Sequence, residues 1–400
     1  MILVESSSEV ETEVQKVRLV DVARIISGGT PKTSVAEYWD GEILWATPKD
    51  LSGLNSVEIS TTPRKITEAG LKSCSAELLP ANSVLFSSRA PIGLLAINTK
   101  PMSTNQGFKS LVPDTSKLNS RYLYRWLEFE REWLQSLGVG ATFKEISKST
   151  MSRVELPLPA LPIQRRIAAI LDKADHLRTQ RSEALAHLDT LTQSIFNGMF
   201  GDPIPGRSIH PSVRIGDVLQ SATYGTSEKA SLDGEIPVLR MNNITYSGEL
   251  DLADLKYMPA GQPEKFLVRD GDLLFNRTNS RELVGKTCVY RGATDMSYAG
   301  YLVRLRLSDL MLPEYLNTFM NLAQTKQLLR NMCKSIVGMA NINAKEVQKI
   351  QVPLPPLELQ QTFAKRVAGI ERLKEQHRAQ LVELDALFAS LQHRAFTGTL

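Results

Sequence analysis

The sequence predicts an α+β protein in which two similar globular heads alternate with two long helices. The main observation is an internal repeat, because residues 156–161 (LPLPAL) return 196 positions later as residues 352–357 (VPLPPL). Each copy follows a stretch of mixed strand and helix patterns and precedes a run of roughly 35 residues with helical periodicity. The chain therefore reads head, helix, head, helix.

Length and composition agree with this organisation. A chain of 400 residues is long for one core and suits two domains with connecting elements. The hydrophobic share is 42% and the charged share 22%, typical of a globular protein, and no apolar run is long enough for a membrane span. A net charge of +4 tolerates an anionic partner without demanding one.

The N-terminus and the cysteines indicate the compartment. Residues 1–16 are rich in glutamate and serine and lack the basic and apolar parts of a secretory signal, so we expect a disordered tail. Cys74, Cys288 and Cys333 show no CxxC spacing, which argues against a disulfide framework and against a zinc site. Three such cysteines are typical of a protein in a reducing compartment. We expect a cytoplasmic protein.

The first head is expected over residues 17–160. Strand-like runs at 42–46, 83–87 and 107–112 alternate with turns, and a helical run follows at 122–137, which together form an α+β pattern.

The second head, residues 212–356, shares this framework. A shift of 193 residues places Tyr122-Leu123 on Tyr315-Leu316. The polar stretches between such matches differ, because the same shift aligns residues 47–50 (TPKD) with residues 240–243 (RMNN). We therefore expect equal scaffolds with unequal surfaces.

Long helices are expected at 161–200 and 357–400, with a linker at 201–211 between the first helix and the second head. Residues on each helix step alternately by four and three, the heptad pattern of a coiled coil. Neither helix can bury this seam alone, so we expect the two to pair antiparallel, as a rod of roughly 50 Å that gives the repeat a pseudo-two-fold axis. The apolar seam residues are Ile170, Leu177, Leu188, Leu191, Ile195, Ile370, Leu373, Leu384, Leu387 and Leu391.

A different interpretation makes both helices core elements of one larger domain. Helices of this length that begin at a proline-rich segment are unusual inside compact folds, which favours the rod.

The sequence offers no recognisable catalytic apparatus. It lacks the GxxxxGK[ST], HExxH and GxSxG motifs. All five histidines fall on the predicted helices or in the linker, so neither head can house a histidine base. The glycine-containing segment 138–143 lacks the third glycine of a nucleotide-binding loop and is interpreted as a turn. We expect no catalytic residue and no metal site in this chain.

Polar recognition chemistry remains. Arginine, lysine, asparagine and glutamine in loops can make paired hydrogen bonds to base edges in the major groove. Each such residue taken alone is more typical of a solvated loop or a turn, so the clusters carry the hypothesis. The candidates are Lys49, Arg64, Lys65, Arg89, Asn105, Gln106 and Lys144 in the first head, and Arg240, Asn242, Asn243, Arg277, Asn279, Arg281 and Lys286 in the second.

Several motifs resemble those of a known family. The chain resembles the DNA-specificity subunits of type I restriction-modification enzymes. The likeness lies in residues 28–31 (GGTP) and 45–51 (WATPKDL), and in the two proline-rich hinges, residues 156–161 and 352–357, each followed by a glutamine, Gln164 or Gln360. The likeness covers nearly the whole chain, and its strength lies in the duplicated layout. The second head departs from the pattern, with residues 224–227 (YGTS) in place of the GGTP turn.

The resemblance implies a function. Each head would be a target recognition domain that reads one half of an asymmetric, bipartite site on double-stranded DNA, while the helices set the spacing and dock methyltransferase subunits, two in the expected complex. Restriction and translocation would belong to further subunits, and S-adenosylmethionine, ATP and Mg to the partners. This chain would hold no cofactor, contact no membrane and supply the address of an adenine methyltransferase and deoxyribonuclease complex without catalysing either reaction.

Two other functions remain open at this point. A free-standing methyltransferase or nuclease would need an Asn/Asp-Pro-Pro-aromatic motif for methyl transfer, and that tetrapeptide does not occur. A scaffold that joins two proteins through its coiled coil without touching DNA would fit the layout as well. Salt-sensitive binding to duplex DNA distinguishes it from the specificity subunit.

Overall fold

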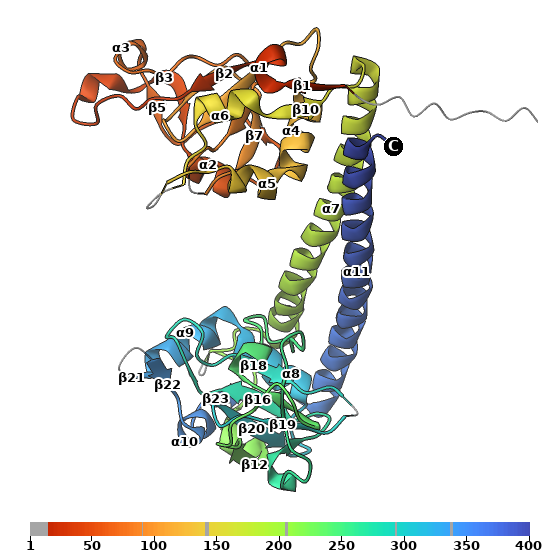
Figure 1. The fold of residues 1–400 in the computed structure, drawn as a ribbon. Helices are drawn as coiled ribbons and strands as arrows, with labels where there is room; N and C mark the ends of the chain where they lie inside the picture. Colours follow the sequence, from red (N-terminus) through yellow and green to blue (C-terminus); the bar gives the residue numbers. More distant parts are fainter. Residues whose placement is uncertain (1–14, 90, 141–143, 205–206, 293, 337–338) are drawn as a thin grey trace, which may run out of the picture. The chain divides into compact units, whose positions relative to one another are not determined.

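The computed structural model describes residues 15–89, 91–140, 144–204, 207–292, 294–336 and 339–400. The chain divides into two compact units. The first contains residues 1–180 and 381–400, and the second contains residues 181–380 (Figure 1). Each unit thus combines one head with parts of both long helices.

The first head forms three sheets, ordered β2-β9-β6-β7-β4, β5-β3-β8 and β1-β10. Most neighbours are antiparallel, but β3 runs parallel to β8 and β4 parallel to β7. Its elements are β1 (Lys16–Arg18), α1 (Leu19–Val22), β2 (Ala23–Ser27), η1 (Ala36–Tyr38), β3 (Trp39–Ala46), α2 (Pro48–Ser52), β4 (Glu58–Ile59), β5 (Lys65–Ile66), α3 (Glu68–Lys72), β6 (Val84–Phe86), β7 (Leu95–Asn98), β8 (Met102–Thr104), β9 (Lys109–Pro113), α4 (Ser120–Phe129), α5 (Arg131–Ser136), α6 (Lys148–Arg153) and β10 (Glu155–Pro157).

The second head repeats this plan with sheets ordered β12-β20-β16-β18, β14-β13-β19-β15 and β11-β23, and adds the sheet β17-β22-β21. The parallel pair recurs between β13 and β19. Its elements are β11 (Ser212–Arg214), η2 (Ile215–Val218), β12 (Leu219–Tyr224), β13 (Ile236–Leu239), η3 (Met241–Asn243), β14 (Lys256–Met258), η4 (Glu264–Phe266), β15 (Leu267–Val268), β16 (Leu273–Asn276), β17 (Thr278–Asn279), β18 (Thr287–Val289), β19 (Met296–Tyr298), β20 (Leu302–Leu307), α8 (Pro313–Asn321), α9 (Ala323–Met332), β21 (Lys334–Ile336), β22 (Met339–Asn341), α10 (Ala344–Gln348) and β23 (Gln351–Pro353).

The proline-rich hinges form the same bonds in both heads. The hydroxyl of Tyr122 donates to the carbonyl of Pro157 at 2.8 Å, and that of Tyr315 donates to Pro353 at 2.9 Å. The hinge strands β10 and β23 pair with β1 and β11 in matching register. The internal repeat predicted from the hinges is confirmed as a repeat of the fold.

The two cores are built from equivalent apolar residues. Phe86 of β6 and Leu123 of α4 are fully buried in the first head. Phe275 of β16 and Leu316 of α8 occupy the matching places in the second. Burial of such side chains stabilises each head by about 1.5–3 kcal/mol per residue, so each head holds its loops on a core of its own.

One helical prediction in the first head was wrong in detail. The run at 122–137 forms two helices, α4 and α5, that are separated at Glu130, which lies outside helical geometry with φ −85° and ψ 12°. The apolar period continues through the break, because Leu127 and Leu134 are both buried in the same core. Periodicity alone therefore did not show the break.

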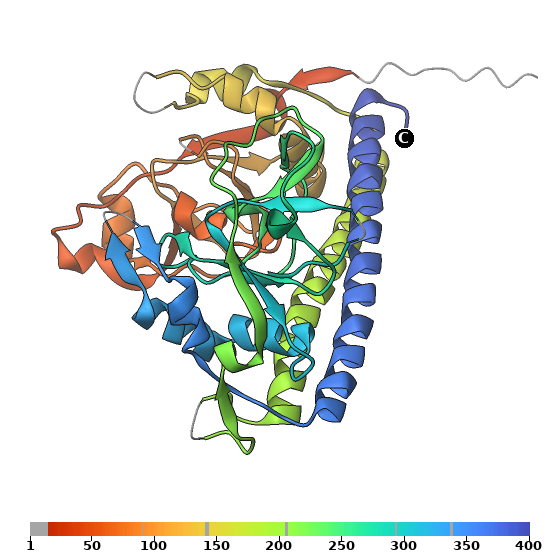
Figure 2. The same ribbon diagram turned by 90° about the horizontal axis from the view of Figure 1, so that it is seen from below.

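The long helices are α7 (Leu161–Phe200) and α11 (Leu357–Thr397). Within the second unit, Arg181 contacts His377 at 3.1 Å and Asp189 contacts Lys374 at 2.7 Å. Residue numbers rise along α7 as they fall along α11, so the pair is antiparallel, as predicted. In each unit, the part of α7 that belongs to it lies beside the matching part of α11 (Figures 1 and 2).

The predicted seam is displaced by one position at two places on α11. Leu191, Leu373 and Leu387 are 43%, 46% and 48% exposed, contrary to the prediction. The residues that follow the last two, Lys374 and Phe388, are buried instead. The remaining predicted residues are buried or partly buried as expected, namely Ile170, Leu177, Leu188, Ile195, Ile370, Leu384 and Leu391.

This displacement has a physical cause. Two neighbouring sets of positions, or tracks, share the heptad period on a helix, and one contains Leu373 where the other contains Lys374. A prediction from the sequence takes the more apolar track and therefore places Leu373 in the seam. The ammonium of Lys374 is nevertheless buried without an unpaired charge, because it contacts Asp189 at 2.7 Å and Glu371 at 3.1 Å. A paired cation can occupy a seam position that an unpaired one could not.

Candidate nucleic-acid interface

In the first head, the side chain of Arg64 lies on two tryptophans. Its guanidinium carbon is 3.8 Å from the ring centroid of Trp39 and 5.2 Å from that of Trp45. The indole N–H of Trp45 donates to the carbonyl of Gly29 at 3.0 Å, which ties this stack to the GGTP turn. Stacking of this kind restricts an arginine while leaving its N–H donors free.

The GGTP turn itself requires close backbone contact. A side-chain carbon at Gly28 would lie 1.9 Å from the carbonyl oxygen of Asn105, so no larger residue fits. In the second head, Gly225 meets the same restriction, since a side-chain carbon there would lie 2.4 Å from the carbonyl oxygen of Ala299. The YGTS segment therefore forms the equivalent turn with one glycine at the position where one is needed.

Other candidates of the first head have varied surroundings. Lys49 and Lys144 are exposed, and Gln106 is exposed and bonded to the hydroxyl of Thr30. Lys65 lies 3.8 Å from Glu42. Asn105 stabilises a turn, because its side-chain oxygen accepts from the backbone N–H of Gly107 at 2.9 Å.

An ionic cluster surrounds Arg89. Its Nε donates to Glu145 at 2.7 Å, and the ammonium of Lys109 contacts the other oxygen of Glu145 at 3.0 Å. Burial opposes ionisation of Glu145, but the bonds from Lys109 and Arg89 outweigh it and lower the pKa of Glu145. Glu145 therefore remains an anionic acceptor beside two cations.

In the second head, two candidates converge on one acid. Arg240 donates to the carboxylate of Asp254 at 2.9 Å, and the amide of Asn242 donates to the same oxygen at 3.0 Å. Arg281 is exposed, whereas Asn279 accepts from the backbone N–H of Ser280 at 2.8 Å.

Two candidates of the second head are structural residues, contrary to the prediction. The side-chain amide of Asn243, which is 1% exposed, donates to the carbonyls of Asp251 and Asp254. The ammonium of Lys286, 7% exposed, donates to the carbonyls of Met241 and Ile244. Their donors are used inside the head, so neither side chain presents a donor to a groove. Residue type predicted the chemistry but did not predict the burial.

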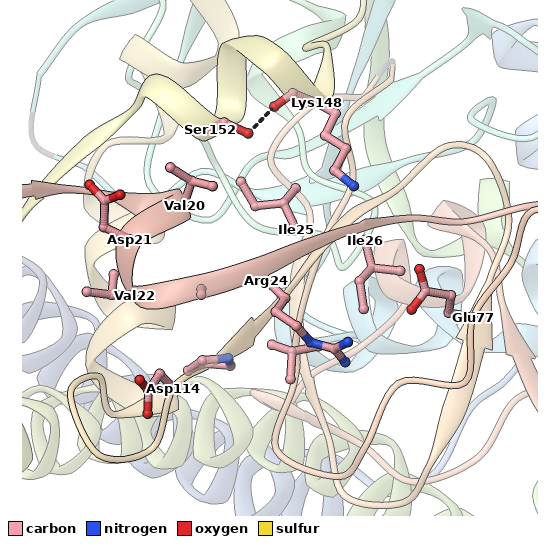
Figure 3. Close-up of a pocket in the computed structure, with 13 residues that line it drawn as sticks. Val20, Asp21, Val22, Arg24, Ile25, Ile26, Glu77, Asp114, Lys148 and Ser152 are labelled. Carbon is pink, nitrogen blue, oxygen red and sulfur yellow. Dashed lines mark hydrogen bonds between the residues drawn. The ribbon is translucent and has the colours of Figure 1, made fainter.

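A pocket of about 640 Å³ runs along β2 in the first head. Figure 3 shows basic side chains, Arg24 and Lys148, together with acidic ones, Asp21, Glu77 and Asp114. None of the candidate DNA-binding residues lines it. Its mixed charge and separate lining exclude it from the candidate interface.

The comparison with protein families decides the identity. The model of the type I restriction modification DNA specificity domain matches twice, over residues 11–187 and 211–384. The chain belongs to this family. The two matches correspond to the two heads with their helices, so the specificity subunit is a tandem of one domain.

Named relatives agree. The chain is 35% identical over 300 residues to the specificity subunit of the type I restriction enzyme MjaIX of Methanocaldococcus jannaschii, which covers 66% of this chain and 69% of the relative. It is 26% identical over 292 residues to the EcoKI specificity subunit of Escherichia coli, covering 68% and 63%. The crystal structure of an S subunit from M. genitalium has the same fold, with a TM-score of 0.59 at 13% identity over 96% of both chains.

These findings place the chain among DNA-specificity subunits, which assemble with other subunits of a restriction-modification system and are not themselves the catalytic ones. No helix among the described residues is long and apolar enough to cross a membrane.

Sequence reasoning missed three residues that lie beside the candidates. Glu145 bonds Arg89, Asn341 lies 3.4 Å from Arg277, and the ring of Tyr224 lies 5.0 Å from the Arg277 guanidinium. In the sequence, only cationic and amide residues that cluster within single loops are recognisable as candidates. Partners that come from distant parts of the chain give no signal of that kind.

Proposed function

We propose that this specificity subunit reads an asymmetric, bipartite site on double-stranded DNA, with one half-site for each head. One observation carries the proposal. The two heads share sheet order, hinge bonds and core, yet they place different polar side chains on this common framework. A duplicated reader with dissimilar surfaces fits two unlike half-sites better than a palindrome.

The candidate residues divide by the contacts open to them. Lys49, Lys144 and Arg281 are exposed and suit phosphates, which fix register and give salt dependence. Arg89, Arg240 and Arg277 are held by neighbouring side chains, and a fixed guanidinium suits a base edge.

The partners follow from the proposed reaction. Two methyltransferase subunits would dock on α7 and α11, where Leu373 and Leu387 are left exposed. These subunits would carry S-adenosylmethionine and take the target adenine out of the stack. Separate restriction subunits would use ATP and Mg. A complex that acts on genomic DNA in this way would work in the cytoplasm of a prokaryotic cell.

Adenine methylation mapped in cells with and without the gene, in the presence of the partner genes, tests the proposal. Arg89→Ala and Arg277→Ala should each relax one half-site only, by about 1–3 kcal/mol if the contact is to a base. Equal losses at both half-sites would contradict the assignment of one half-site to each head. Absence of salt-sensitive duplex binding, even with the partner subunits, would instead support a scaffold that does not bind DNA.

A further inference from the structure

The backbone just after a central strand, β6 or β16, makes matching hydrogen bonds to two other segments in each head. We call this place the crossing point. In the first head, the N–H of Ser88 donates to Gly107 at 2.7 Å, and the N–H of Ile146 donates to the carbonyl of Ser88 at 2.9 Å. In the second, the N–H of Arg277 donates to Tyr301 at 3.0 Å, and the N–H of Ile342 donates to the carbonyl of Arg277 at 2.9 Å. Ser88 and Arg277 therefore occupy one position of the common framework.

Strand register extends this equivalence. Ser27 faces Lys109 in the first head, and Tyr224 faces Val303 at the same place in the second.

A further cross-strand pair completes the match. Arg89 faces Glu145, and Thr278 faces Asn341. We call each set a crossing site. The first consists of Ser27, Ser88, Arg89, Lys109 and Glu145, and the second of Tyr224, Arg277, Thr278, Val303 and Asn341.

All five positions differ in chemistry, whereas the apolar framework beneath them is retained. Phe86 and Phe275 are equivalent and fully buried, as are Leu111 and Leu305. A structural role would favour equal residues on an equal backbone. A different side chain at each of the five positions is what two readers of different sequences require.

The first crossing site centres on an acceptor. Glu145 is 31% exposed and is fixed by Arg89 on one oxygen and by Lys109 on the other. The ammonium of Lys109, only 8% exposed, also lies 3.4 Å from the hydroxyl of Ser88. Each carboxylate oxygen can accept a second hydrogen bond, so Glu145 can take one from an outside amine.

The second crossing site centres on donors. The Arg277 guanidinium lies over the ring of Tyr224, and its contacts to Gly300 and Asn341 are long, at 3.5 and 3.4 Å. Its Nε and the side-chain nitrogen of the fully buried Asn276 have no hydrogen-bond partner among the described residues. Donors left unpaired in this way are costly unless a ligand completes them.

We propose that the two crossing sites are the base-reading sites of the subunit, with Glu145 accepting from an exocyclic amine of cytosine or adenine and Arg277 donating to guanine. The inference rests on the proposed function and adds to it the residues and the base chemistry. Acidic side chains pair with exocyclic amines, and arginine pairs with O6 and N7 of guanine.

The test uses the assembled methyltransferase complex and sequencing of methylated adenines on a randomised DNA library. Glu145→Gln and Arg277→Lys keep size and polarity while changing the pattern of donors and acceptors. The matched controls are Glu68→Gln on α3 and Arg269→Lys in the second head, which are 84% and 61% exposed. Discrimination at the affected base pair should fall roughly 10- to 100-fold.

The expected result is that Glu145→Gln changes one half-site, Arg277→Lys changes the other, and the controls change neither. Unaltered methylated sequences in both variants would overturn the inference and leave the proposed function standing. Loss of discrimination for every base of a half-site, together with a lowered melting temperature, would show a structural role and overturn it as well. Failure of the unaltered complex to methylate any specific sequence would count against the proposed function itself.

Discussion

At the scale of single residues, the glutamine after each hinge makes the same set of hydrogen bonds in both copies of the repeat. Gln164 is fully buried, accepts from the N–H of Asn119 at 2.8 Å and donates to the carbonyls of Lys117 and Pro159. Gln360 makes the corresponding bonds to Leu312, Leu310 and Pro355. One side chain thus joins the start of each long helix to its head.

Gln164→Ala should therefore loosen the first head locally. It leaves the buried partners of the amide unpaired, at a cost of about 1–3 kcal/mol for each group that water does not reach. Hydrogen exchange in α4 and the first turns of α7 should become faster, while exchange in the second head stays unchanged. Gln193→Ala, on an exposed face of α7, is the control. Equal exchange in both variants would show that the amide is dispensable.

Lys326 gives the second head a pH dependence. Burial, followed by the positive charges of Lys286 and Arg330, lowers the pKa of Lys326 to about 7 from an ordinary 10.5. Between these values the unfolded chain holds a proton that the folded head does not, so stability should rise with pH across that window. Lys326→Met should flatten this dependence in unfolding experiments, and exposed Lys345→Met should not. Burial also lowers the pKa of Lys286, so part of the slope should remain. An unchanged slope in Lys326→Met would refute the assignment.

The sequence predicted these residues unevenly. It identified Gln164 and Gln360 through the repeat, and it identified Arg89 and Arg277 through their chemistry. It did not separate exposed donors from Asn243 and Lys286, because a loop can turn a polar side chain inward to bond its own backbone. Such burial depends on the positions of backbone carbonyls that are distant in the sequence, and these positions cannot be predicted from the pattern of a single sequence.

At the scale of elements, the paired helices follow the heptad period but select the less obvious track. Leu373 is exposed while Lys374 is buried, and Leu387 is exposed while Phe388 is buried. The Phe388 ring packs in the first unit, 4.5 Å from the guanidinium of Arg178. Periodicity predicted the existence and the direction of the pair. The track depended on ion pairs and on head contacts that periodicity does not contain.

The corrected seam can be tested by neighbouring substitutions. Lys374→Ala should destabilise the second unit by about 1–3 kcal/mol, less than loss of a fully buried ion pair because Asp189 and Glu249 keep contact with water. Leu373→Ala should change stability by no more than about 0.5 kcal/mol, as surface substitutions do. Denaturant unfolding followed by circular dichroism measures both, and the opposite order of effects would restore the originally predicted seam.

At the scale of the whole molecule, the units do not coincide with the halves of the sequence. The second unit contains residues 181–200 of α7, and the first contains residues 381–397 of α11. In the second unit, the end of α7 packs closely against residues from the second half of the chain. The ring centroid of Phe200 lies 4.8 Å from that of Tyr315 and 5.3 Å from that of Phe363. Each half of the chain therefore supplies part of the core of both units.

This exchange predicts that the chain survives a cut in its linker. A protease site placed after Asp202 should yield two fragments that remain associated, because the aromatic cluster of the second unit joins Phe196 and Phe200 to residues beyond the cut. Size-exclusion chromatography of the cut protein should show one peak at the mass of the intact chain. The same cut combined with Phe196→Ala and Phe200→Ala should release the fragments, since each truncation removes about 3–5 kcal/mol of core packing, whereas Asn197→Ala on the exposed face should not. Separation of the fragments without any substitution would mean that the linker, rather than the shared cores, holds the halves together.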